Sequence, residues 1–261
     1  MTENSRNVFD MDRPLLTTIV LAALAILGTF LFVPYFPQNP AYHHFADTRL
    51  LLGIPNFWNV VSNLPFLVIG VLSLVTVRRN IPEIVFGAAL VLTAFGSGLY
   101  HYMPNDATLF CDRAGIVIAA VAVIALLVGE HRTATLVIAE AVGIGSLAWW
   151  MMNGDLRLYG VVQFFPGLLI IILPLLFPAR YRHKGALAMV IVCYAIAKAC
   201  ELYDAQIYAA LHVVSGHTLK HLVAAASTLA IWMWMRRQPM TLESSPPALG
   251  VMSSPARETT T

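Results

Sequence analysis

Apolar stretches recur along the chain, and short polar segments separate them. A helix of about 20 apolar residues is long enough to cross the hydrocarbon core of a bilayer. Eight stretches meet this length: residues 15–35, 58–77, 83–101, 113–129, 133–151, 158–177, 185–204 and 216–235. The pattern predicts an all-α, polytopic bundle of transmembrane helices.

Composition supports this interpretation. The 261 residues are 58% hydrophobic and 11% charged, whereas a soluble domain carries roughly 25% charged residues. The formal net charge of +2 argues neither for nor against a nucleic-acid partner, but the sequence has no basic aromatic surface, so we expect none. The cysteines Cys111, Cys193 and Cys200 are odd in number and form no short pair, so we interpret them as apolar filling of the bundle.

The first stretch is a true span in this interpretation rather than a signal peptide. It has no small-residue cleavage site and is long for the apolar part of a signal. Five segments follow from this assignment: a cytoplasmic amino-terminal segment (1–14), an extra transmembrane helix (15–35), an outer loop (36–57), a seven-helix core (58–235) and a disordered cytoplasmic tail (236–261).

Lys and Arg are enriched in cytoplasmic loops and therefore predict the orientation. With eight spans, eleven basic residues fall on one side: Arg6, Arg13, Arg78, Arg79, Arg132, Arg180, Arg182, Lys184, Arg236, Arg237 and Arg257. Three fall on the other side: Arg49, Arg113 and Arg157. Both termini are predicted to be cytoplasmic, and the compact loops favour a bacterial inner membrane.

Two histidines stand four residues apart in the last apolar stretch. At this spacing His217 and His221 share one face of a helix. Two neutral imidazoles so placed can bind one metal ion together. A pair of polar core histidines is the alternative, but polar groups inside a membrane span are costly and usually functional.

The predicted orientation brings three more polar residues to the depth of this pair. Ser97 and His101 share a helical face at the outer end of the third span, and Asp112 opens the fourth span from the same side. Three histidines and one open position are the ligand count of a catalytic zinc site. Asp112 is then the candidate general base or proton shuttle for water, and Ser97 the candidate partner of an oxyanion. The alternatives are an Asp112–Arg113 ion pair and a Ser97 hydroxyl bonded to its own helix.

Other polar residues are expected to support the bundle. The asparagines of residues 56–63 recur at helical spacing and are predicted to face its interior. Lys198, Glu201 and Asp204 share a face of the seventh span, where we expect an ion pair and allow a supporting role behind the metal ligands. Lys220 is expected to face away from the histidine pair and to extend toward the membrane surface.

These motifs together resemble the alkaline ceramidase family. The matching residues, in chain order, are Phe57-Trp58-Asn59, Ser62-Asn63-Leu64, Gly96-Ser97, His101, Asp112, His217 and His221. The resemblance covers roughly residues 56–235. The family belongs to a wider group of seven-helix membrane hydrolases that includes progestin and adiponectin receptor-like proteins and GPI-lipid remodelling proteins.

The resemblance implies a zinc amidase that acts within the membrane on the amide of ceramide or a related long-chain lipid. It implies that His101, His217 and His221 hold zinc, that Asp112 handles the proton and that Ser97 stabilises the reacting oxygen. The extra span has no counterpart in the family. Alkaline ceramidases also have an acidic calcium-binding run, which is replaced here by Phe45-Ala46-Asp47-Thr48-Arg49, with Asn56 in place of a glutamate. This difference argues against calcium binding and against tight specificity for ceramide.

Two other functions fit the same residues. The first is a receptor-like or structural seven-helix module in which a metal ion ties helices together. The second is a hydrolase that remodels lipid esters. The sequence leaves the oligomeric state open.

Overall fold

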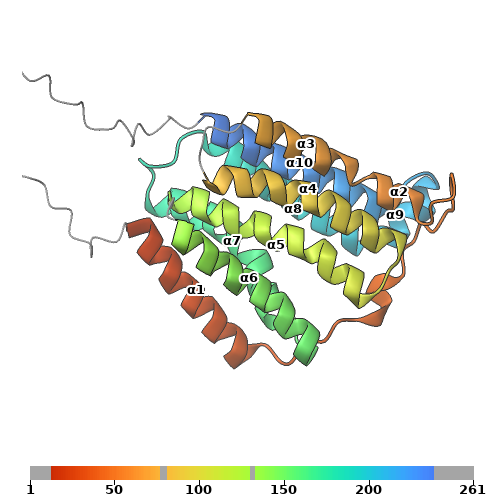
Figure 1. Ribbon diagram of the computed structural model, residues 1–261, viewed down its shortest axis with the longest axis horizontal. Coiled ribbons are helices and arrows are strands. Elements are labelled where there is room, and N and C mark those ends of the chain that lie inside the picture. Colours follow the sequence, from red (N-terminus) through yellow and green to blue (C-terminus); the bar gives the residue numbers. More distant parts are fainter. Residues whose placement is uncertain (1–12, 77–80, 130–132, 238–261) are drawn as a thin grey trace, which may run out of the picture.

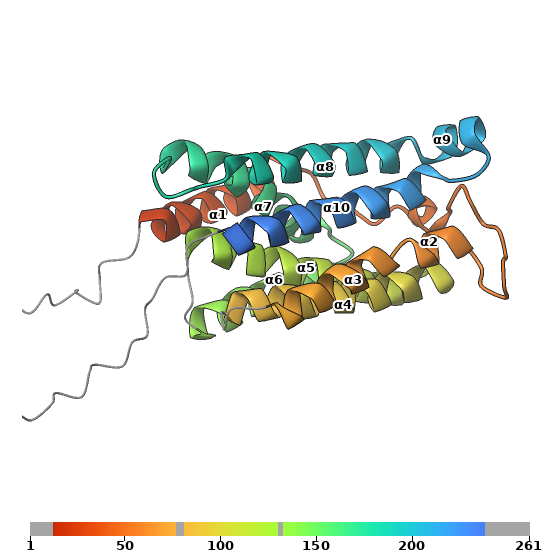
Figure 2. The same cartoon turned by 90° about the horizontal axis from the view of Figure 1, so that it is seen from above.

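The computed structural model describes residues 13–76, 81–129 and 133–237. These residues form an all-α bundle, and no β-strand occurs among them. Figures 1 and 2 show the long helices running side by side along the long axis of the molecule. The predicted fold class is therefore confirmed.

The long helices follow the predicted apolar stretches closely. They are α1 (Arg13–Phe32), α3 (Leu64–Val75), α4 (Ile81–Tyr102), α5 (Asp106–Val128), α6 (Thr133–Asn153), α7 (Arg157–Leu176), α8 (Lys184–Leu202) and α10 (Gly216–Arg237). Three short helices complete the described chain: η1 (Pro40–His43), α2 (Phe57–Val61) and α9 (Asp204–Leu211).

Within the described residues, seven helical segments are long and apolar enough to cross a membrane, with α2 and α3 counted as one. The helix α10 is not among them, because His217, Lys220 and His221 lower the hydropathy of its first half. It nevertheless packs along α8 and α3, and its last residue lies at the same end of the bundle as the start of α1 (Figures 1 and 2). An even number of passes places the two ends of the bundle on the same side, and eight passes would do so. The eighth span therefore remains a prediction, and this geometry favours it.

Large apolar side chains fill the centre of the bundle and also lie on its outer surface. Phe86, Leu90 and Leu169 are almost fully buried in the main core, which α3, α4, α5, α7, α8 and α10 build together. On α1, in contrast, Leu24 and Leu31 are more than half exposed. An apolar outer surface of this kind is suited to lipid rather than to water.

The span predicted at 58–77 is interrupted between α2 and α3. The amide of Asn63 bonds to the carbonyl of Val60, which tightens the turn and leaves the Asn59 carbonyl without its usual helical partner. The side chains of Asn63 and Ser62 donate to that carbonyl at 2.8 and 3.1 Å. Pro65 lies in the first turn of α3, where a proline is tolerated. The predicted span is therefore present, but it consists of two helices joined by a tight turn.

Small residues bring α4 and α5 into close contact. A Cβ atom added at Gly115 would lie 2.6 Å from the backbone nitrogen of Thr93, and one at Gly96 would lie 2.8 Å from the carbonyl carbon of Cys111. Real side chains do not fit at such distances, so glycine is required at both positions. This contact places Ser97 and Asp112, the residues that follow Gly96 and Cys111, at the same level of the bundle.

Some predicted segments differ from the structure or lie beyond it. The seventh span ends at Leu202 rather than 204, and the short helix α9 occupies the connection to α10. Residues 1–12 of the amino-terminal segment and 238–261 of the tail lie outside the described residues, so their predicted cytoplasmic location and the disorder of the tail stay predictions.

Candidate metal centre

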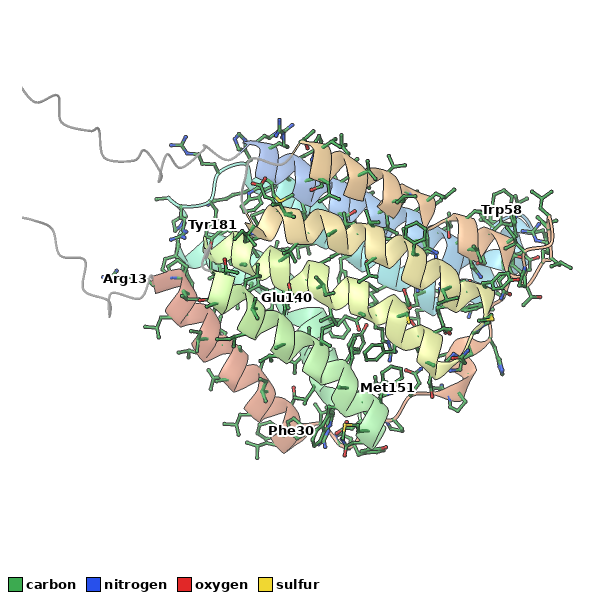
Figure 3. The ribbon with its side chains drawn as sticks, viewed as in Figure 1. Arg13, Phe30, Trp58, Glu140, Met151 and Tyr181 are labelled. Atoms are coloured by element: carbon green, nitrogen blue, oxygen red, sulfur yellow. The ribbon has the colours of Figure 1, made fainter. Side chains whose placement is uncertain are left out.

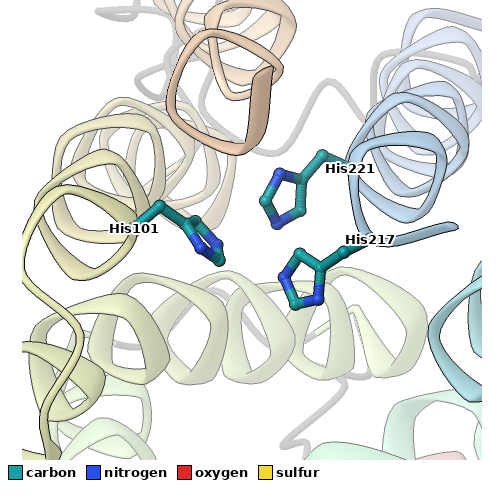
Figure 4. Close-up of side chains that lie close together, drawn as sticks. All are labelled: His101, His217 and His221. Atoms are coloured by element: carbon teal, nitrogen blue, oxygen red, sulfur yellow. The ribbon is translucent and has the colours of Figure 1, made fainter. Parts of the chain in front are cut away.

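Three imidazoles converge at one end of the bundle. His101 comes from the last turn of α4, and His217 and His221 come from the first two turns of α10, so the ligands bridge two helices far apart in sequence (Figure 4). One nitrogen of each ring lies within 4.8 Å of the others, and the three side chains are buried. Within the described residues, no other group of three or more His, Cys, Asp or Glu side chains lies close enough to hold an ion.

The nitrogens of this triad fit a metal ion. Both ring nitrogens of His101 and Nε2 of His217 are buried, and no other described residue offers them a hydrogen bond. Leaving such atoms without a partner costs free energy, and a coordinated ion would remove that cost. The ring centroids lie 4.7–4.9 Å apart. Neutral imidazole is a preferred ligand of zinc and of several other transition metals.

A hydrogen bond selects the nitrogen that His221 can give to a metal. The Ser62 hydroxyl donates to the carbonyl of Asn59 and therefore accepts from the His221 ring, whose Nδ1 lies 2.7 Å away. The proton is thereby assigned to Nδ1, which leaves the lone pair on Nε2. Outer partners of this kind orient histidine ligands and increase their basicity. Sequence analysis did not assign this role to Ser62.

The carboxylate of Asp204 fixes the start of α10. One of its oxygens accepts from the backbone amide of His217 at 2.6 Å, and the other accepts from the amide of Ala46 at 3.0 Å. A carboxylate is favoured at a helix amino terminus, where amides are unpaired and the helix dipole is positive. Asp204 thus contacts the backbone of one candidate ligand, and its supporting role behind a metal stays a prediction.

The predicted asparagine stripe does face the interior, and it holds the helices that carry the ligands. Asn56 donates to the carbonyl of His101 at 2.8 Å, and Asn59 accepts from the hydroxyl of Thr218 at 2.8 Å. Asn56, Asn59 and Asn63 are all buried. The stripe connects α2 both to α4 and to α10.

The outer loop folds over the triad. The ring of Phe45 is buried, with its centroid 4.7 Å from that of His101 and 5.0 Å from that of His217. Burial opposes ionisation of Asp47, but hydrogen bonds from Arg49 at 2.8 and 2.6 Å outweigh it and hold the pKa of this carboxyl below its usual value. Because Arg49 already occupies the Asp47 carboxylate, the loop offers no free carboxylate there for calcium.

Ser97 and Asp112 line a cavity beside His221. The cavity has a volume of about 250 Å³, and both side chains form part of its lining. The predicted alternative partner, Arg113, instead donates to Gln38 at 2.8 Å and packs on the rings of Trp150 and Tyr159. The structure therefore brings the two candidate catalytic residues to one cavity, which one of the three imidazoles also lines.

Lys220 faces this cavity, and the prediction that it extends toward the membrane surface was wrong. Its ammonium lies 3.1 Å from Glu201, which also binds Lys198 at 2.8 Å and the hydroxyl of Tyr42 at 3.0 Å. The expected Lys198–Glu201 ion pair is confirmed. A buried carboxylate with two lysines satisfies the rule that charges inside a bundle are paired.

Comparisons with protein-family models, with curated proteins and with solved structures gave no match.

Replacing Ser62 with Ala should weaken metal binding. The change removes the acceptor of His221 Nδ1–H, and losing such a partner typically costs roughly 10–100-fold in affinity. Competition with a chelator would measure the affinity. Ser73→Ala is the matched control, because Ser73 is also buried but lies on α3 away from the triad. Equal affinities in the Ser62→Ala protein and the parent would exclude this role.

Proposed function

We propose that the protein is a zinc-dependent intramembrane hydrolase that cleaves the amide bond of ceramide or a related long-chain lipid amide. The observation that carries the proposal is the buried triad His101, His217 and His221, with partnerless nitrogens, next to a cavity that holds Asp112 and Ser97. The motifs that resemble alkaline ceramidases support the same assignment.

A zinc ion held by the three imidazoles would supply Lewis-acid chemistry and lower the pKa of water toward ~7. Asp112 accepts the proton that water loses as its oxygen adds to the amide carbonyl carbon. The Ser97 hydroxyl donates a hydrogen bond to the carbonyl oxygen as negative charge develops on it. Asp112 then returns the proton to the nitrogen as the C–N bond breaks. The products are a fatty acid and a long-chain base.

The choice of an enzyme over a structural metal site rests on the donor set. Structural zinc usually has four protein ligands, whereas catalytic zinc keeps one position open. The triad provides three candidate ligands, and the adjoining cavity is lined by the carboxyl of Asp112 and the hydroxyl of Ser97. The same geometry would serve a lipid ester, so esters belong in the assay.

The test combines metal analysis with a hydrolysis assay on the purified full chain. We expect one zinc per chain and release of fatty acid from a fluorescent ceramide, with activity lost on chelation and restored by zinc. A zinc-loaded protein that cleaves no lipid amide would reject the amidase. Cleavage of esters alone would favour the remodelling enzyme.

We further propose that both termini are cytoplasmic and that the triad lies toward the outer side of a bacterial inner membrane. The basis is the eleven-to-three distribution of basic residues. In a background without the native cysteines, an impermeant thiol reagent should label Asp106→Cys but not Arg182→Cys in intact cells. The reverse labelling would invert the orientation.

A further inference from the structure

A second, larger cavity lies between α1, α7 and α8. Its volume is about 980 Å³, at the upper end of the ~300–1,000 Å³ typical of ligand sites. Leu24, Ala25 and Gly28 of α1 form one wall, and Gly160, Phe164 and Leu168 of α7 form another. We call this space the α1–α7 channel. The extra helix, which the resemblance to ceramidases does not explain, is therefore part of a cavity wall.

The α1–α7 channel adjoins the cavity that holds Asp112. The two spaces share lining residues, of which the polar ones are Tyr42, Arg113, Tyr159, Gln163, Tyr194, Lys198 and Glu201. One end of the channel is thus polar and adjoins the candidate catalytic residues. The remainder, toward α1, is largely apolar.

The glycines that line the channel leave open space, whereas other glycines of the bundle allow two helices to pack closely. A Cβ atom added at Gly28 or at Gly160 would meet nothing within 4 Å, and one at Gly167 would meet only Ile191 Cδ1 at 4.0 Å. The glycines that pack helices together differ, since a Cβ at Gly70 would lie 2.9 Å from a backbone oxygen. Along the channel, the missing side chains leave space.

The surroundings of α1 indicate what fills that space. This helix packs mainly against α7, and its other faces expose apolar side chains (Phe30 on α1 is labelled in Figure 3). An empty apolar cavity loses dispersion contacts, and water makes few hydrogen bonds in one. Bilayer lipids are the molecules that an apolar opening beside α1 would meet, and an acyl chain matches its lining.

The polar end of the channel offers a site for the group attached to that chain. Arg113 is 6% exposed, and its Nη1 atom is buried without a hydrogen-bond partner among the described residues. An unsatisfied buried donor costs free energy until an acceptor reaches it. A carbonyl or hydroxyl oxygen of a lipid at the junction would provide that acceptor.

We propose that the α1–α7 channel binds the acyl chain of a membrane lipid, with the polar group of the lipid at the junction beside Arg113. The helix α1 then forms the wall of a lateral lipid-binding site. The identification of this lipid as the substrate rests on the proposed hydrolase function. The proposal that the channel binds an acyl chain rests on the lining of the channel alone.

Photolabelling tests the proposal. The full chain, in phosphatidylcholine nanodiscs, would be illuminated with a ceramide that carries a diazirine midway along its N-acyl chain. We expect labelled peptides to come from α1 and α7 around Gly28 and Gly160. The double variant Gly28→Leu/Gly160→Leu fills the channel, and labelling there should fall at least ~10-fold, since even a methylene changes occupancy of an apolar pocket by about that factor. Leu is also a better helix former than Gly, so folding should be preserved.

Gly145→Leu is the matched control. A Cβ at Gly145 also meets nothing within 4 Å, but this residue lies on α6 and lines neither cavity. Channel labelling should be unchanged in this variant. Labelling of α1 and α7 no stronger than that of the exposed α6 residues Val137 and Ile138, or labelling unaffected by the double substitution, would overturn the proposal.

The labelling would be measured in an Asp112→Asn background, so that turnover does not consume the probe. Channel labelling together with a parent protein that cleaves no lipid amide would support the channel and count against the hydrolase. Amide cleavage by the parent without channel labelling would retain the hydrolase and reject the channel.

Discussion

Replacing His217 and His221 together with Ala should remove both the metal and the activity. Two of three ligands are lost, and a single remaining imidazole on α4 does not hold an ion in competition with water. Zinc content measured by mass spectrometry should fall from one per chain to background, and hydrolysis of lipid amides should become undetectable. Circular dichroism would verify that the helices persist.

His44→Ala is the control for this experiment. His44 lies in the outer loop near the triad, but it is exposed and is not one of the three converging side chains. Its loss should leave zinc and turnover at the parent level. Stoichiometric zinc in the His217→Ala/His221→Ala protein would show that these residues are not the ligands.

The length and apolar composition of the stretches were sufficient to predict the bundle, because a transmembrane helix satisfies its own backbone hydrogen bonds. Within a bilayer, helices are the natural form of a long apolar segment, so length and composition carry the information. The spacing of His217 and His221 likewise fixed their common face. The clustering of His101 with them followed from the predicted order of spans, and the structure brings the three together.

The features that sequence analysis missed depend on side-chain geometry between distant segments. Lys220 was expected at the membrane surface, but Glu201 on the neighbouring helix provides it with a buried partner. The break at Ser62 arises from one 3₁₀-type hydrogen bond, and it is this break that turns the hydroxyl toward His221. No periodicity encodes the contacts of Lys220 and Ser62, because their partners lie on helices distant in the sequence.

The loop over the site was missed for a related reason. The sequence predicted only an outer loop at residues 36–57, whereas in the structure Phe45 covers the imidazoles and Asp204 anchors the amide of Ala46. A single buried aromatic residue among polar neighbours is a weak signal in a sequence. It becomes informative only once the triad beneath it is in place.

Asp112→Asn should retain zinc and lose most of the turnover. The carboxamide has nearly the shape of the carboxylate but does not accept a proton from water, so general base catalysis disappears, which typically costs ~10²–10⁴ in rate. This loss corresponds to a rise of about 3–5 kcal/mol in the activation barrier. The three imidazoles are unchanged, so zinc should stay at one per chain. Metal content and turnover would be measured on the same preparation.

The matched control is Asp106→Asn, which lies in the first turn of the same helix but is exposed and contacts His43 rather than the cavity. It should behave like the parent in both measurements. If instead zinc only ties α4 to α10, Asp112→Asn should be as mild as the control, because no step then uses the carboxylate. A zinc-loaded Asp112→Asn protein that hydrolyses lipid amides at the parent rate would therefore remove Asp112 from the mechanism. If neither the parent nor the variant cleaves an amide or an ester, the helix-tying metal site is the better explanation of the triad.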